Sequence, residues 1–119
     1  MRVTRLYTGD DGHSHFEEVD LPTERVSDGV EVTPLPGAAG VFLRTLDERS
    51  NPGSEQFHGA QRRQYAVMLS GHMEVWLRDG SRRVFGPGDI LMSEEVSDGE
   101  GHAARTFLGP RVTLYVPME

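Results

Sequence analysis

Histidine is the residue type through which this chain can do chemistry. The sequence contains five histidines and no cysteine. Without thiolates, a metal ion has to be bound by imidazole, carboxylate or amide groups. An imidazole, with an ordinary pKa of about 6.5, also exchanges protons near neutral pH. The side chains therefore allow metal binding or acid–base catalysis, and they exclude a disulfide framework.

Three of the five histidines lie beside predicted turns. His13 and His15 flank the turn of residues 9–12, and His72 follows Gly71. We expect surface or structural roles for all three, and we expect His72 to be exposed. The first two would reach a pocket only if the N-terminal strand folded over its opening.

Short β-strands must position these side chains. The 119 residues include 14 glycines and seven prolines, which are spread between short apolar runs without helical periodicity. This length suits a single domain, residues 1–119, with one small pocket. We therefore predict an all-β domain, with strands at residues 3–8, 15–21, 30–33, 41–46, 56–60, 64–70, 73–78, 82–85, 90–92, 103–108 and 112–116.

The strand at residues 73–78 has two distinct faces. Met73, Val75 and Leu77 alternate along it, so we expect these three to fill the core. The opposite face then carries polar residues and Trp76, which is a candidate contact with a second subunit because aromatic side chains concentrate at interfaces.

The charge and hydropathy of the chain exclude several kinds of partner. A formal net charge of -7 repels a phosphate backbone, so we expect no nucleic acid partner. No apolar stretch reaches membrane-spanning length, and residues 1–10 lack the features of a signal peptide. We therefore expect a soluble, cytoplasmic protein with no membrane partner.

Two segments resemble the motifs of the cupin superfamily. Residues 57–71, FHGAQRRQYAVMLSG, are similar to the first motif, G-x5-H-x-H-x3-4-E-x6-G. In this alignment His58 takes the place of the first histidine, Ala60 replaces the second, and Gln64 replaces the glutamate. Residues 86–102, GPGDILMSEEVSDGEGH, are similar to the second motif, and His102 takes the place of its last metal-binding histidine.

The resemblance is closer still to a group of short bacterial cupins. These carry W-H-x-A-P-R-R-Q, then L-S-G-x-x-E, F-G-P-G-D and E-D-T-T-G-K-G-H, and the similarity extends over almost the whole chain. This sequence departs from them at Phe57, which replaces Trp, and at Gln61, which replaces Pro. Residues 95–100 also replace D-T-T-G-K, so that a lysine is lost and Glu100 is gained near the expected pocket mouth.

The resemblance implies a fold, a site and an oligomeric state. The fold is an antiparallel double-stranded β-helix, the cupin or jelly-roll barrel, and the oligomer is a homodimer. The site consists of His58, Gln64 and His102, as catalytic residues, as ligands of a divalent metal (Fe, Zn, Ni or Mn), or as both. Because the set has no carboxylate to neutralise a metal charge, a metal-free pocket is the rival interpretation. We expect no organic cofactor.

We interpret the protein as a small-molecule enzyme that works in the barrel pocket by acid–base or metal-assisted chemistry. The expected reaction is an isomerisation, cyclisation or elimination on a substrate that contains a carbonyl or another oxygenated group. One alternative is a metal-dependent dioxygenase, and another is a cupin that binds a metabolite without turnover.

Glu94, Glu95, Asp98 and Glu100 lie in an acidic loop. One of them could supply an acid or base at the pocket mouth, but such loops are ordinarily solvated surface, which is the role we expect. We expect Arg44 to face solvent beside a nearby acidic residue.

Overall fold

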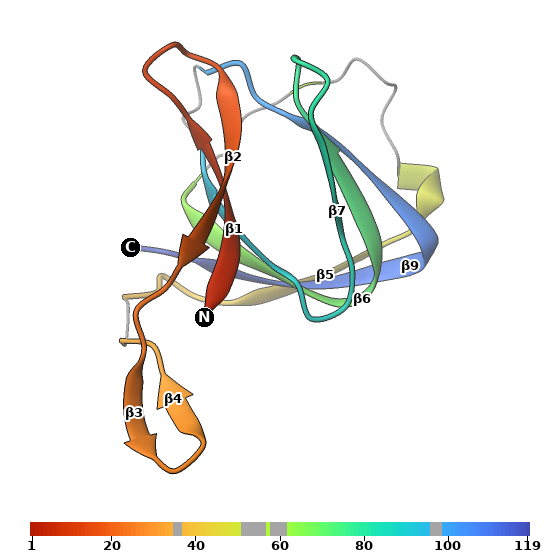
Figure 1. Cartoon of the computed structure of the whole chain (residues 1–119). Helices are drawn as coiled ribbons and strands as arrows, with labels where there is room; N and C mark the ends of the chain where they lie inside the picture. Colours follow the sequence, from red (N-terminus) through yellow and green to blue (C-terminus); the bar gives the residue numbers. More distant parts are fainter. Residues whose placement is uncertain (35–36, 51–56, 58–61, 96–98) are drawn as a thin grey trace.

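The fold is taken from a computed structural model, which describes residues 1–34, 37–50, 57, 62–95 and 99–119 (Figure 1). The described chain folds into nine β-strands and one short 3-10 helix, η1 (Glu48–Ser50). The strands are β1 (Arg2–Thr8), β2 (Ser14–Asp20), β3 (Glu24–Ser27), β4 (Val30–Val32), β5 (Phe42–Leu46), β6 (Gln64–Trp76), β7 (Arg82–Phe85), β8 (Ile90–Glu94) and β9 (Ala103–Pro117). The predicted all-β class is confirmed.

Seven of these strands form one mixed sheet. Its order is β2-β1-β8-β6-β9-β5, and β7 pairs with β6 beside this path. Strands β1 and β8 run parallel, whereas the other neighbours are antiparallel. Within the described residues, β2 and β5 are edges that do not pair with each other, so the sheet is not closed into a barrel.

The two longest strands, β6 and β9, form a bent ribbon at the centre of the sheet (Figure 1). Each was predicted as two strands, and each continues instead through a bend. Gly71 in β6, with a φ of 71°, and Gly109 in β9, with a φ of 89°, have backbone conformations that favour glycine. The register between the strands shifts twice close to Gly71, as in β-bulges, so the ribbon turns a corner without losing its pairing.

The core lies on one face of this sheet, called the inner face here. It is a cluster of buried apolar side chains: Leu6, Ala66, Met68, Met73, Val75, Leu77, Phe85, Leu91 and Tyr115. The predicted core face of residues 73–78 is confirmed, since Met73, Val75 and Leu77 are at most 5% exposed. The prediction for His72 is wrong, because its ring is half-buried beside Phe107 and its Nδ1 atom is buried without a hydrogen-bond partner in the described chain.

Strands β3 and β4 form a separate hairpin that projects from the rest of the molecule (Figure 1). All seven of their residues are exposed, including Val26, Val30 and Val32. No helix in the described part of the chain is long and apolar enough to cross a membrane.

Candidate functional site

A buried carboxylate and an imidazole meet at one end of the inner face. The Nδ1 atom of His102 is in hydrogen-bond contact with Oε1 of Glu95. The Ser14 hydroxyl donates a hydrogen bond of 2.5 Å to the other carboxylate oxygen. The Glu95 side chain is 0% exposed and that of His102 is 13% exposed. These three residues form a polar chain that is almost shielded from water.

Strand alternation places the three residues on the same face. His102 directly precedes β9 and is two residues from Ala104, which packs against the core cluster. Glu95 follows β8 and is two residues from Ser93, a buried residue of that strand. Ser14 is the first residue of β2, where it lies opposite Thr8 of β1. The site therefore joins the N-terminal hairpin to the second half of the chain.

Gln64 lies at the same end of the inner face. It is the first residue of β6 and lies directly opposite Ser93 of β8. Ser93 is two residues before Glu95, the residue that contacts His102. The third predicted residue, His58, lies outside the described residues.

The contact with Glu95 determines what His102 can do. A carboxylate that accepts a hydrogen bond from Nδ1 fixes the ring orientation and keeps the proton on Nδ1, so that the lone pair lies on Nε2. An imidazole held in this way acts as a general base through Nε2, and the carboxylate stabilises the imidazolium that forms. The same arrangement orients histidines that bind metals.

Sequence reasoning missed Ser14, and it favoured a surface position for Glu95 over an acid–base role. The prediction that Glu95 belongs to a solvated loop is wrong, since the residue is 5% exposed. Leu91, Ser93 and Glu95 alternate, so extending the pattern of the apolar strand by one more residue would have placed Glu95 on the core face. Glu94 points the other way and pairs with Arg5 at 3.0 Å and with Arg63 at 3.1 Å.

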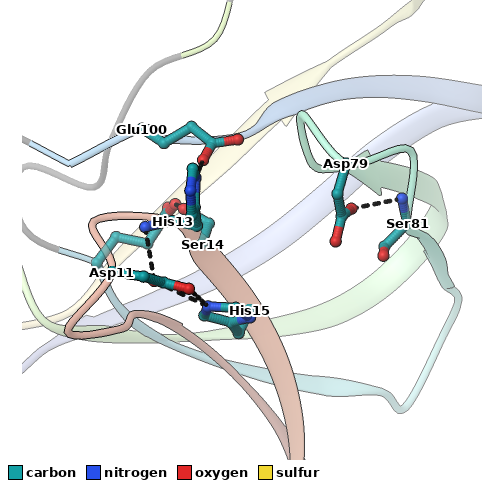
Figure 2. A network of polar contacts seen from close by, with 8 residues as sticks. Asp11, His13, Ser14, His15, Asp79, Ser81 and Glu100 are labelled. Carbon is teal, nitrogen blue, oxygen red and sulfur yellow. Dashed lines mark hydrogen bonds and ion pairs between the residues drawn. The ribbon is translucent and has the colours of Figure 1, made fainter.

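The rim of the site is tied to the N-terminal hairpin (Figure 2). Figure 2 shows the Glu100 side chain beside the ring of His13, whose Nδ1 atom it contacts. The Glu100 backbone N–H also donates to the carbonyl of Gly12 at 3.1 Å. Glu100 is therefore not a freely solvated residue either, and its side chain is 12% exposed. The hydrogen bond with Glu100, together with the charge of Glu100, raises the pKa of His13 above its ordinary value of 6.5.

Asp11 organises the turn below this contact. Its carboxylate accepts a hydrogen bond of 2.9 Å from the backbone N–H of His13 and lies 3.1 Å from the Nε2 atom of His15 (Figure 2). These two hydrogen bonds lower the pKa of Asp11. The N-terminal hairpin thus does reach the end of the sheet where His102 lies, and His13 contacts the segment that leads into it.

The described residues do not by themselves form a metal site. No group of three His, Asp or Glu side chains in the described ranges is placed to hold a metal ion. Gln64 and His102 would supply two of the three predicted ligands, and Glu95 is engaged by Nδ1 of His102 and by Ser14.

Two peripheral predictions concern Arg44 and Trp76. Arg44 is exposed, as predicted. Trp76 is half-buried on the outer side of β6, and the guanidinium of Arg82 lies 5.6 Å from the centre of its ring.

Comparison with known proteins gives no family assignment. No family model matches this chain, and no curated protein is significantly similar to its sequence.

Proposed function

We propose that the protein is a small-molecule enzyme that transfers a proton at a carbon next to a carbonyl group, within a fold of the cupin type. The observation that carries the proposal is the contact between the buried carboxylate of Glu95 and Nδ1 of His102. The cupin assignment rests on the two sequence motifs, and the all-β sheet with its bent ribbon of β6 and β9 is consistent with it.

The proposed reaction begins with proton abstraction by His102. Its Nε2 atom takes the proton from the substrate carbon, and Glu95 stabilises the imidazolium that results. The amide N–H of Gln64 donates a hydrogen bond to the enolate oxygen that develops. Return of the proton to another carbon completes an isomerisation, and loss of a leaving group completes an elimination. His58 remains the proposed second acid–base residue, on the basis of its motif position alone.

Deuterium exchange tests this proposal without knowledge of the natural substrate. Acetone, cyclohexanone, pyruvate and acetoacetate are incubated with the protein in heavy water, and loss of the α-proton signal is followed by proton NMR. We expect exchange of at least one of these compounds above the uncatalysed rate. His102→Gln should reduce that rate by about 100-fold or more, and Glu95→Gln should cause a comparable loss.

The matched control is Glu94→Gln, which removes the neighbouring carboxylate that pairs with Arg5 and Arg63 outside the site. It should leave the exchange rate unchanged. Equal rates in the wild type, His102→Gln and Glu95→Gln would overturn the assignment of His102 as the base.

Two alternative functions give different results in the same preparation. A metal-dependent dioxygenase would contain a stoichiometric redox metal after purification without chelator and would consume oxygen with its substrate. A binding protein without turnover would retain ligand affinity in the absence of any exchange. Replacement of both His58 and His102 should then abolish binding.

We further propose that the protein forms a homodimer through its outer face. Leu43, Leu114, Val67 and Ile90 occupy neighbouring positions in β5, β9, β6 and β8, on the side opposite the core, and form the outer apolar row. Val67 and Ile90 also line a groove of about 340 Å³. Within the described chain, the projecting hairpin packs mainly on itself, and isolated two-stranded hairpins are marginally stable. A second copy would cover both apolar surfaces, so the outer apolar row replaces Trp76 as the favoured contact.

The absence of cysteine is consistent with a reducing compartment, and it supports a proposed cytoplasmic location.

A further inference from the structure

Arg111 is a buried cation that the proposed reaction does not use. It is 5% exposed and follows directly on the corner of β9 formed by Leu108, Gly109 and Pro110. The backbone of this corner lies against Gly71, where an added Cβ atom would be 2.8 Å from Cα of Arg111. The position of Arg111 is therefore set by the close approach of the two long strands.

Neutral hydroxyl groups are its partners. The Nε atom donates to Oγ1 of Thr106 at 3.2 Å, and Nη1 donates to Oγ1 of Thr113 at 2.9 Å. Both threonines are at most 1% exposed. In the part of the chain that the structure describes, no carboxylate forms an ion pair with Arg111. These bonds use two of the five N–H donors of the guanidinium.

A guanidinium in this setting lacks the negative charge that would offset its desolvation. Arginine stays protonated in proteins, and burial of a charge without a counterion costs several kcal/mol. Its planar fork of donors matches a carboxylate, which it binds through two parallel hydrogen bonds. One positive charge also balances one carboxylate, whereas a phosphate with a charge near two would need a second cation.

The inner face of β9 connects Arg111 to His102. His102, Ala104 and Thr106 alternate along the strand, so Ala104 is the residue of β9 that lies between His102 and Thr106 on this face. Ala104 is partly accessible although it packs against the core cluster. Thr106 is four positions beyond His102 along the strand, a distance of about 13 Å.

We propose that Arg111, held in place by Thr106 and Thr113, binds the carboxylate of an elongated acid whose oxygenated end lies at His102. This inference rests on the proposed function and names its substrate class: chain-like carboxylic acids with a carbonyl or hydroxyl group distant from the carboxylate. The apolar middle of the ligand would lie along Ala104.

The test uses hexanoate as the probe and hexanamide as its neutral isostere. Thermal melting and calorimetric titration of the full chain should show binding of hexanoate and at least about tenfold weaker binding of hexanamide, the loss expected when one charged hydrogen-bond partner is removed. Arg111→Met should abolish this preference, and Arg111→Lys should weaken hexanoate binding while retaining some of it.

Further variants keep the test decisive if Arg111→Met does not fold. Thr113→Val keeps the charge and removes one supporting hydroxyl, so hexanoate binding should weaken several-fold while hexanamide binding stays constant. Arg82→Met, which removes a cation from the outer face of the same sheet, is the control and should bind hexanoate like the wild type. In NMR spectra, hexanoate should shift the ring signals of His102, whereas acetate should not.

Two results would overturn the inference: equal binding of hexanoate and hexanamide by the wild type, or an unchanged preference in Arg111→Met. Failure of the proposed function has a different signature. In that case hexanoate would still bind through Arg111, but no ketone would exchange its protons. If α-proton exchange depended on His102 but hexanoate binding did not depend on Arg111, the proposed function would stand and only the inference about Arg111 would be overturned.

Discussion

The buried carboxyl group of Glu95 has two hydrogen-bonding neighbours, the hydroxyl of Ser14 and the ring of His102. Truncation of either neighbour would leave a buried carboxylate with unmet hydrogen-bonding capacity, which is costly in a protein interior. The same chain of contacts that orients the proposed base therefore also contributes to stability. Conservative replacements such as glutamine for glutamate separate these two effects better than alanine does.

The contact between His13 and Glu100 predicts a pH dependence of stability. Because the contact raises the pKa of His13 in the folded state, its contribution is fully present below the ordinary pKa of 6.5 and is lost as the pH rises through the raised value. His13→Gln should therefore lower the melting temperature at about pH 6 and have little effect at about pH 9.

Glu100→Gln is the partner variant for this experiment. Its melting temperature should decrease with the same pH dependence. At about pH 6 the double variant should melt only slightly below either single variant, since each single change removes the same contact. Asp11 and Asp79 also favour the charged form of His13, so a small residual pH effect should persist in Glu100→Gln. A melting difference that does not change with pH would contradict the prediction.

The site shows what residue patterns can and cannot predict. The motif resemblance selected Gln64 and His102, and the structure places Gln64 opposite Ser93 of β8 and His102 in contact with Glu95. Ser14 could not be found from residue patterns, because its contact with Glu95 spans 81 residues and depends on the pairing of β1 with β8. Strand alternation could have predicted the buried position of Glu95, but its acidic neighbours favoured the prediction of a solvated loop.

At the scale of elements, the corner at Gly71 predicts a strong effect of one methyl group. A Cβ atom there would lie 2.6 Å from the carbonyl oxygen of Pro110 and 2.8 Å from Cα of Arg111. Both neighbours are backbone atoms of a paired strand, which cannot move independently. Gly71→Ala should lower the free energy of unfolding by at least about 2 kcal/mol, which urea denaturation measures.

Gly80 supplies the matched control for Gly71. It also has a positive φ, 91°, but nothing lies within 4 Å of an added Cβ atom. Gly80→Ala should therefore lower the free energy of unfolding only by the conformational strain of a side chain at positive φ, about 1 kcal/mol. Equal decreases in the free energy of unfolding of Gly71→Ala and Gly80→Ala would show that the contact with β9 does not constrain the corner.

The difference between these two glycines also explains the errors in predicted strand boundaries. Gly80 lies in the turn between β6 and β7, where the sequence rule for turns holds. Gly71 has a similar φ, yet β6 continues through it because β9 bends alongside. Whether the chain turns or continues as a strand at such a glycine depends on the neighbouring strand. Local sequence therefore predicted where strands occur better than it predicted which of them are continuous or how they are ordered in the sheet.

At the scale of the whole molecule, the outer apolar row predicts a homodimer. Leu43 is 65% exposed and lies on the edge strand β5, where a buried charge would be most disruptive to an interface. Sedimentation equilibrium should show a dimer for the wild type and a monomer for Leu43→Glu. Val84→Glu, at a residue of β7 that is 52% exposed, should remain dimeric.

The projecting hairpin supplies a second and independent test of the same dimer. Val26→Glu should shift the equilibrium towards monomer if the hairpin reaches the partner subunit. A monomeric wild-type protein at micromolar concentration would contradict the proposed dimer.

The parallel pairing of β1 with β8 has a consequence for how the protein is made. Thr4 of β1 is paired with Leu91 of β8, so the hairpin of β1 and β2 cannot join the main sheet until β8 has been synthesised. Contacts so distant in sequence slow folding, because the entropy cost of closing a large loop comes before the contacts can form and stabilise the protein. The polar chain of Ser14, Glu95 and His102 therefore cannot assemble before β2, β8 and the segment that leads into β9 have all been synthesised.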